Sequence, residues 1–326
     1  MQVSPHVLQE GCVRFGADPA TTHPRPGEET ANYYTELDGT AVMLRFAPIP
    51  AVDPRTETRF VARYDFAAFL AAGGAHVAQP VKSNGENLIE WIEDPTLRSR
   101  WALVAVEWVD GGPIEAYRLN QYASSVIRAW GELMGTMHAL TKSYPVTDAV
   151  GGWDQESAHF MNICGDPLVA EKWQEMRAHL AELSTDIDSY GFVHNDLHSM
   201  NVIAQGDSVT AIDFDDACYH WFACDIAIAM QAVLWTTPDA VETNMPRWRQ
   251  VYRAFMSGYR ERNDLDSMWE DEIPTFLGYR RLLLYSVFHN VWKRPRGWQK
   301  DRLGAWKNGI ISGTPVIGPV SFTPGR

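Results

Sequence analysis

Two apolar segments in the second half of the chain, each bordered by acidic and amide side chains, restrict the fold more than any other feature. Residues 192–203 contain Asp196 and Asn201 five positions apart, with a break in the apolar pattern between them. Residues 209–216 follow a Gly-Asp pair that favours a tight turn between two strands. The segments therefore predict a strand, a polar loop and a hairpin.

The spacing of these polar residues is the spacing that kinase-type phosphoryl transfer requires. An Asp orients the acceptor hydroxyl, an Asn five residues later helps to hold Mg²⁺, and an Asp on the next strand binds the metal. Asp196, Asn201 and Asp213 occupy these positions. Oxygen ligands suit Mg²⁺, and positioning with charge neutralisation provides most of the catalysis. The pattern predicts Asp196 as the catalytic residue and Asn201 and Asp213 as metal ligands.

The motif His194-x-Asp196-Leu197-His198-x-x-Asn201, followed by Ile212-Asp213-Phe214-Asp215, resembles the aminoglycoside phosphotransferase and choline kinase family. The version Asp213-Phe214-Asp215-Asp216 is similar to the homoserine kinase-like and stress-response kinase-like branches of that family. The resemblance implies an α+β, two-lobed, protein-kinase-like fold. A small antiparallel-sheet lobe for the nucleotide would span residues 1–110. A larger, mainly helical lobe with the catalytic loop and acceptor pocket would span residues 111–326. The cofactors implied are ATP and Mg²⁺.

A hairpin is predicted at residues 31–37 and 40–46, because Asp38-Gly39 is a strong turn signal. Arg45 is the one charged residue within the second of these strands. The resemblance places here the basic residue that holds the nucleotide phosphates. Arg suits this role, since its fork matches phosphate oxygens, although an edge-strand Arg can also point to water.

The predicted helix at 56–72 is where the kinase template places a Glu paired with this basic residue. Asp65 and Glu57 are the nearest acidic residues, and the sequence leaves open which of them pairs with Arg45. The strand that ends near residue 108 leads into a turn that would be the hinge between lobes. By resemblance, the backbone of Glu107 and Val109 would hydrogen-bond the adenine.

Four further residues are given supporting roles by the resemblance. His194 would pack under the catalytic loop, and His198 would be structural or lie near the phosphate. Asp215 would add charge beside the metal or contact the substrate. Asp225 would bond to the backbone of the catalytic loop, although a carboxylate that stabilises a helix start is an alternative reading.

The two ends of the chain contain frequent Pro and Gly and show no helical period. Residues 1–30 are expected to be loop-like, and the last thirty or so residues are expected to form an irregular tail. The acidic residues at 264–272 would either line the acceptor pocket, which helices build in the family, or form a solvated face.

Composition limits the partners. The net charge of −13 argues against nucleic acid, which is bound by basic surfaces. There is no signal-peptide pattern and no apolar run of membrane-spanning length, so no membrane association is expected. The four cysteines lack a CxxC or zinc-finger spacing and fit a cytoplasmic protein with reduced thiols. The expected partner is a small-molecule hydroxyl acceptor, and the acidic and Trp-rich second lobe suggests that it bears an amine.

Three other functions remain open from the sequence. His194, Asp196 and His198 follow one another at every second position, which is a spacing that metal ligands on a strand can have. A metallohydrolase is therefore one alternative. The glycine-poor segment 27–32 and the missing helix Glu fit a nucleotide-binding pseudokinase, although the retained Asp and Asn residues argue against it. A Ser/Thr protein kinase of the stress-response type is the third alternative.

Overall fold

The structure is a computed structural model, and the residues that it describes are 1–27, 30–49, 54–95, 99–114, 124–234 and 241–317. Contacts divide the chain into two compact units. The first consists of Met1–Gly111, Pro145–Val150 and Thr210–Asp215, and the second of Gly112–Tyr144, Gly151–Val209 and Asp216–Arg326. The predicted α+β class is confirmed, because the first unit contains an antiparallel sheet and the second is mainly helical.

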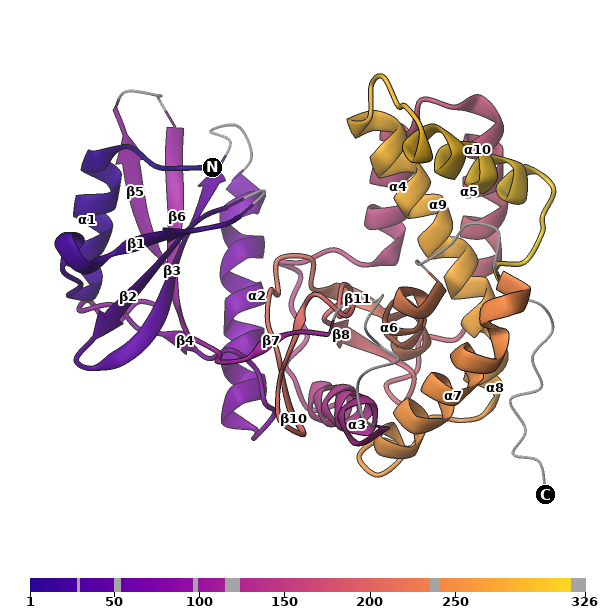
Figure 1. The fold of residues 1–326 in the computed structure, drawn as a ribbon, viewed down its shortest axis with the longest axis horizontal. Helices are drawn as coiled ribbons and strands as arrows, with labels where there is room; N and C mark the ends of the chain where they lie inside the picture. The colour runs from indigo at the N-terminus through magenta and orange to yellow at the C-terminus, as the bar shows by residue number, and fades with distance from the viewer. Residues whose placement is uncertain (28–29, 50–53, 96–98, 115–123, 235–240, 318–326) are drawn as a thin grey trace. The chain divides into compact units, whose positions relative to one another are not determined.

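The first unit is a sheet with one helix on each face (Figure 1). Its elements are α1 (Pro5–Phe15), η1 (Pro19–Thr21), β1 (His23–Arg25), β2 (Ala31–Leu37), β3 (Thr40–Ile49), α2 (Pro54–Ala72), β4 (Pro80–Val81), β5 (Glu90–Asp94) and β6 (Ser99–Glu107). The described strands pair antiparallel in the order β1-β2-β3-β6-β4, and β5 also pairs with β6.

The predicted hairpin between β2 and β3 is confirmed. Asp38 and Gly39 have φ values of 49° and 81°, which place both residues of the turn in the left-handed region. Such a turn matches the twist of the strands that it joins. Its register pairs Asn32 with Arg45, so the position of Arg45 along β3 is fixed by the turn.

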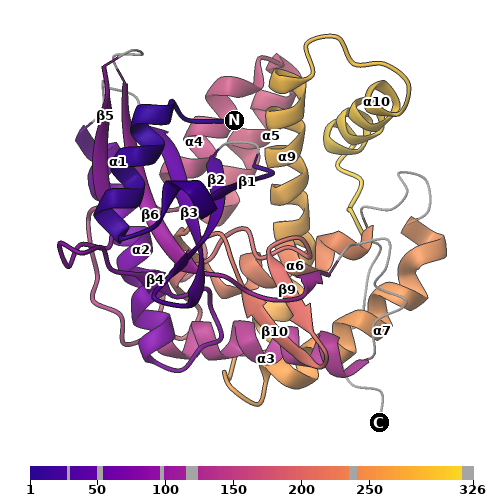
Figure 2. The same cartoon turned by 60° about the vertical axis from the view of Figure 1, so that its left-hand side comes forward.

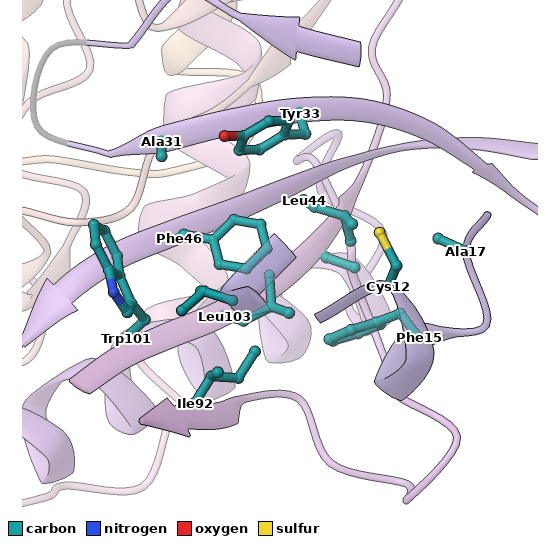
Figure 3. Close-up of a cluster of buried hydrophobic side chains, with 12 residues drawn as sticks. Cys12, Phe15, Ala17, Ala31, Tyr33, Leu44, Phe46, Ile92, Trp101 and Leu103 are labelled. Atoms are coloured by element: carbon teal, nitrogen blue, oxygen red, sulfur yellow. The ribbon is translucent and has the colours of Figure 1, made fainter. Parts of the chain in front are cut away.

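Side chains alternate between the two faces of the sheet and bury two separate cores. Leu44, Phe46 and Leu103 face α1 and form the cluster shown in Figure 3. Ala102 and Val104 face α2, where they pack with Phe60, Tyr64 and other buried side chains. Arg45 lies between Leu44 and Phe46 in the sequence, so the same alternation directs it toward the α2 face.

Helix α1 corrects the prediction that residues 1–30 are loop-like. The Ser4 hydroxyl accepts a hydrogen bond from the Val7 N–H at 3.4 Å, which caps the first turn. Val7, Cys12 and Phe15 are buried against the sheet. A Cβ at Gly11 would lie 2.8 Å from the Phe46 and Leu103 side chains, so the backbone of α1 approaches the sheet closely. The helical period was missed because a glycine stands in the middle of the buried face.

The second unit is built from helices around two small sheets. Its elements are β7 (Gly112–Pro113), α3 (Ser124–Thr141), α4 (Trp153–Cys164), α5 (Pro167–Leu180), β8 (Tyr190–Val193), β9 (Val202–Gln205), β10 (Ser208–Ala211, whose last two residues belong to the first unit), β11 (Cys218–Trp221), α6 (Phe222–Leu234), α7 (Val241–Tyr259), α8 (Met268–Asp271), α9 (Ile273–Val291) and α10 (Trp298–Ile311). Strand β8 pairs with β11, and β9 lies between β7 and β10. Helices α3 and α7 pack against each other (Figure 2).

Two predictions about this half of the chain have different outcomes. The hairpin turn between β9 and β10 is confirmed, and Gly206 has a φ of 62°. The expected irregular tail is wrong, because α10 covers residues 298–311. Leu303 and Ile310, seven residues apart, are its buried apolar side chains, so the helical period was too sparse to recognise.

Two features of the whole described chain are relevant to the expected class. All four cysteines are buried, and none forms a disulfide with another described residue. In the part of the chain that the structure describes, no helix has both the length and the apolar character needed to span a bilayer.

Candidate active site

Arg45 joins the turn after β10 through two ion pairs in the first unit. Its Nη2 atom lies 2.9 Å from Asp213 Oδ1 and 2.9 Å from Asp215 Oδ2. The Tyr64 hydroxyl of α2 donates to Asp215 Oδ1 at 3.1 Å. Burial alone would lower the pKa of Arg45, but the Asp215 carboxylate and its neighbours raise it well above the usual value. The guanidinium is therefore a fixed positive charge beside two carboxylates.

Neither of the two acidic residues that the sequence offered as a partner, Asp65 or Glu57, pairs with Arg45. Helix α2 turns Tyr64 toward Arg45, and the next residue, Asp65, is rotated by about 100° and is exposed. Glu57 lies two turns earlier, about 10 Å along the helix, and forms an ion pair with Arg100 instead. The prediction that Asp65 or Glu57 pairs with Arg45 is therefore wrong. The actual partners, Asp213 and Asp215, lie on a turn that is distant in the sequence.

The turn that carries Asp213 is fixed on both sides. The Ala78 N–H donates to the Ala211 carbonyl at 2.8 Å. The rings of Phe214 and Phe66 pack edge to face at 6.2 Å. Asp213 itself has a φ of 68°, a left-handed conformation that non-glycine residues seldom adopt. Such strain persists only where the surrounding structure imposes it, and it is concentrated at functional sites.

The residues predicted to contact adenine lie at the end of β6. The Glu107 N–H donates to the Gln79 carbonyl at 2.9 Å, and the Trp108 N–H donates to the Ala41 carbonyl at 3.0 Å. The Val109 N–H makes no hydrogen bond with any described residue. Val109 can therefore donate to a ligand, whereas the Glu107 N–H is already used and only its carbonyl could serve.

In the second unit, hydrogen bonds to the buried residue Asp225 of α6 fix the loop after β8. Asn195 has a φ of 63°, and its N–H donates to Asp225 Oδ1 at 2.8 Å. His194 is buried, and its Nδ1 accepts the Asp196 N–H at 3.3 Å. His138 Nε2 lies 3.2 Å from Asp225 Oδ2. Asp225 thus fastens the loop through its backbone from the first turn of α6.

His138 is buried, and both of its ring nitrogens have hydrogen-bond partners. Its Nδ1 lies 2.9 Å from the Tyr259 hydroxyl, and its ring stacks on Phe222 at 4.4 Å. Burial alone would raise the pKa of Asp225, but its hydrogen bond with His138 and the charges nearby lower it. The carboxylate beneath the loop is therefore kept ionised.

Both carboxylate oxygens of Asp196 have partners. Oδ1 forms an ion pair with Arg280 of α9. Oδ2 accepts the Asn201 amide at 3.3 Å and lies 3.4 Å from His198 Nε2. The Asn201 amide nitrogen also donates to the Asp196 carbonyl at 3.0 Å. Because both Asn201 contacts use the nitrogen, its Oδ1 keeps its capacity to accept or to bind a cation.

Arg280 is a residue of the site that the sequence did not suggest. Burial alone would lower the pKa of Arg280, but the Asp196 carboxylate raises it. Two adjacent arginines, Arg280 and Arg281, inside the apolar helix α9 are the signal that could have identified it. Charged side chains are seldom buried unless they are paired, so each requires a specific partner.

The contacts of His198 lie within its own loop. His198 Nδ1 accepts the Met200 N–H at 3.1 Å, so Nε2 carries the hydrogen and faces Asp196. Burial is the main cause of the lowered pKa of His198, and the Asp196 carboxylate opposes it. Among the described residues there is no group of three or more His, Cys, Asp or Glu side chains that could hold a metal.

A buried polar group lies behind the loop. Glu156 Oε1 accepts the Asn195 side-chain amide, and Oε2 accepts the Tyr279 hydroxyl. Burial raises the pKa of Glu156, and these hydrogen bonds oppose that shift only in part. His220 Nε2 lies 3.9 Å from Glu156 Oε2. These contacts tie α4 and α9 to the loop that carries Asp196.

The acidic residues at 264–272 are not a uniformly solvated face. Glu270 is buried and is bound by the Tyr252 hydroxyl and by Arg260. Asp266 caps the start of α8, where its Oδ1 accepts the Met268 N–H at 2.9 Å. These two carboxylates stabilise the local fold, so they carry no indication of an amine-bearing acceptor.

A strand arginine paired with a strained Asp, together with a loop in which Asp and Asn are joined, defines the class of kinase-like phosphotransferases. The chain belongs to the phosphotransferase enzyme family, whose model matches residues 21–267. This membership confirms the family resemblance and excludes the metallohydrolase alternative.

Two amicoumacin kinases are among its relatives. The chain is 28% identical over 318 residues to amicoumacin kinase of Bacillus subtilis (strain 168), which covers 95% of this chain and 93% of that protein. The solved structure of amicoumacin kinase hAmiN, in complex with AMP-PNP, Ca²⁺ and Ami, has a TM-score of 0.84 and 26% identity, over 96% of this chain and 94% of that one.

A more distant neighbour is a microcompartment-associated aminopropanol kinase. Its structure has a TM-score of 0.71 and 18% identity, and it covers 94% of this chain and 95% of that one. This likeness shows the shared fold.

Proposed function

We propose that this protein transfers the γ-phosphoryl group of ATP to a hydroxyl group of a small molecule, and that amicoumacin is the first acceptor to test. The observation that carries the proposal is the set of contacts that hold the Asp196 carboxylate. Its carboxylate is held by a guanidinium and an amide on a backbone-anchored loop. A carboxylate held in this way can accept a hydrogen bond from an acceptor hydroxyl and direct it toward phosphorus.

The first unit supports the nucleotide side of the proposal. Arg45 would bind the phosphates, and the Val109 N–H and Glu107 carbonyl would bind the adenine. Asp213 and Asn201 would hold Mg²⁺, which would neutralise phosphate charge. Oxygen ligands that suit this ion are present in each unit. In the first unit, one carboxylate oxygen of Asp213 and one of Asp215 lie 2.9 Å from Arg45 Nη2, and in the second unit Asn201 Oδ1 accepts no hydrogen bond from a described residue. Mg²⁺ bound with nucleotide usually takes only one or two carboxylates from the protein.

The acceptor is proposed from the relatives. Two of them are amicoumacin kinases, and the chain matches each over nearly its whole length. The loop residues would have separate roles in that reaction. Asp196 would orient the hydroxyl, while His194, His198 and Asp225 would keep the loop in place. An amine on the acceptor remains a prediction from the sequence.

The test is a phosphorylation assay on the full-length protein. It would be incubated with amicoumacin, ATP and Mg²⁺, and the product would be examined by mass spectrometry for one added phosphoryl group. Asp196→Asn should lower turnover by about 10²- to 10⁴-fold, the usual contribution of a positioned base, with ATP affinity unchanged. Phosphorylation of 1-aminopropan-2-ol but not amicoumacin would replace the proposed acceptor. Binding of ATP with no phosphorylation of any hydroxyl compound or protein would favour the pseudokinase alternative.

A further inference from the structure

A single nitrogen of Arg45 bridges two carboxylates. Its Nη2 lies 2.9 Å from an oxygen of Asp213 and 2.9 Å from an oxygen of Asp215, so each of its two hydrogens can serve one carboxylate. Two carboxylate oxygens directed at one point can also supply part of the coordination shell of a divalent cation, which water and phosphate oxygens complete. In this structure a guanidinium fills that point.

Asp215 is itself held in position. Tyr64 donates to the carboxylate oxygen that Arg45 does not use, at 3.1 Å. In kinases a helix Glu orients the basic strand residue. Here helix α2 supplies Tyr64, and the carboxylate comes from the turn that also carries Asp213.

Arg45 and a metal ion cannot share these oxygens. Mg²⁺ requires oxygens at about 2.0–2.1 Å, and a guanidinium at hydrogen-bond distance from the same two oxygens would be repelled by the ion. Phosphate oxygens are an alternative partner for the guanidinium, because they match its fork. The guanidinium and the metal ion therefore compete for the same two carboxylates. Nucleotide phosphates can favour the metal ion by binding the guanidinium.

We propose that Arg45 occupies the place of the divalent cation between Asp213 and Asp215 in the nucleotide-free protein and moves to the phosphates when ATP binds. Asp215, oriented by Tyr64, is then the positioning residue for Arg45. The inference rests on the proposed function, since it concerns the same nucleotide site. Its consequence is that metal and ATP bind cooperatively, and such coupling is necessarily reciprocal.

Metal affinity without nucleotide tests the inference directly. Mn²⁺ would be titrated into the full-length protein and followed by electron paramagnetic resonance, first alone and then with saturating AMP-PNP. Arg45→Gln should bind Mn²⁺ alone more tightly than wild type, by about 5- to 150-fold, the usual range of coupling between two ligands. The gain in Mn²⁺ affinity on adding AMP-PNP should be smaller in Arg45→Gln than in wild type. Arg45→Lys keeps a competing charge and should fall between the two.

The matched control is Arg100→Gln. Arg100 also belongs to the sheet and pairs with a carboxylate of α2, Glu57, so its loss changes the net charge equally. Its Mn²⁺ affinity should equal that of wild type. Tyr64→Phe removes one hydroxyl and no charge, and it should reduce the preference of the protein for ATP over adenosine. A merely structural role of Tyr64 would weaken both ligands alike.

The outcomes separate the two proposals. If AMP-PNP binds but Mn²⁺ affinity is the same in wild type and Arg45→Gln, the proposal that Arg45 competes with the metal is wrong, and the proposed function stands. If AMP-PNP binds to neither the wild type nor the variants, with or without Mn²⁺, the proposed function fails as well. Should Arg45→Gln unfold, Arg45→Lys and Tyr64→Phe still decide the question.

Discussion

Arg280 forms an ion pair with Asp196, and the two residues lie 84 positions apart in the sequence. The pair joins the loop after β8 to helix α9. Removing one member of a buried ion pair leaves the other charge uncompensated, which is more costly than the pair itself. The orientation of the Asp196 carboxylate therefore depends on a side chain from outside its loop.

The first prediction is that Arg280→Gln lowers the turnover of acceptor phosphorylation while ATP affinity stays near wild type. The expected loss is about 10²-fold, the cost of a small misplacement of a catalytic group. Steady-state kinetics and calorimetry with ATP would measure the two effects. Arg280→Lys should recover part of the turnover, since it restores the charge.

The control for this prediction is the neighbouring arginine. Arg281 donates to the carbonyls of Gly309 and Thr314 and does not contact Asp196. Arg281→Gln should change thermal stability more than turnover. An equal loss of turnover in both variants would mean that α9 is needed only for folding.

How much of the site could be predicted from sequence depended on distance along the chain. Asp196 and Asn201 were assigned from a five-residue spacing, and the structure joins them by hydrogen bonds within one loop. The partners of Arg45 lie 168 and 170 residues away, and no local pattern identifies them. Arg280 was missed for the same reason, because only tertiary packing brings it to Asp196.

The fold could likewise be predicted only where local sequence determines structure. The turn at Asp38-Gly39 was predictable because turn geometry restricts residue type. Helices α1 and α10 were not, since each buries few large apolar side chains and their periods are weak. Their stability comes from packing against the rest of their own unit, which a local pattern does not contain.

A second prediction concerns the metal. Asp213→Asn should remove most of the dependence of ATP affinity on Mg²⁺, because a neutral amide cannot replace the carboxylate. Asn tolerates the left-handed backbone of this position, so the turn should keep its shape. Calorimetry of ATP binding with Mg²⁺ and with a chelator measures the dependence. If wild type bound ATP equally well in both, the metal assignment of Asp213 would be wrong.

A third prediction tests the packing of α3 against α7. A Cβ at Gly131 would lie 1.8 Å from the Phe255 carbonyl oxygen, so backbone meets backbone at this crossing. Gly131→Ala should destabilise the protein by at least about 1–3 kcal/mol, the usual cost of overpacking. Gly304 of α10 has nothing within 4 Å of its Cβ position, and Gly304→Ala should stabilise by about 1 kcal/mol. Urea unfolding compares the variants, and a Gly131→Ala protein as stable as wild type would contradict the close crossing.

The last prediction concerns pH and His220. This histidine is fully buried, and its Nδ1 accepts the Trp221 N–H at 3.0 Å. Burial lowers its pKa from 6.5 to about 3, and the negative charge of Asp225 opposes the shift only weakly. The folded state therefore binds the proton less readily than the unfolded state. The stability that depends on neutral His220 is present above pH 6.5 and is lost progressively as the pH falls toward 3.

His220→Gln should remove this contribution. In wild type the free energy of unfolding should decrease on acidification by up to ~1.4 kcal/mol more per pH unit than in the variant, which corresponds to one proton. The comparison uses slopes between pH 6 and 4, so a uniform loss of stability from altered packing does not affect it. Exposed His159 of α4 provides the control, and His159→Gln should keep the wild-type slope. Parallel slopes for wild type and His220→Gln would show that His220 takes up its proton equally in both states.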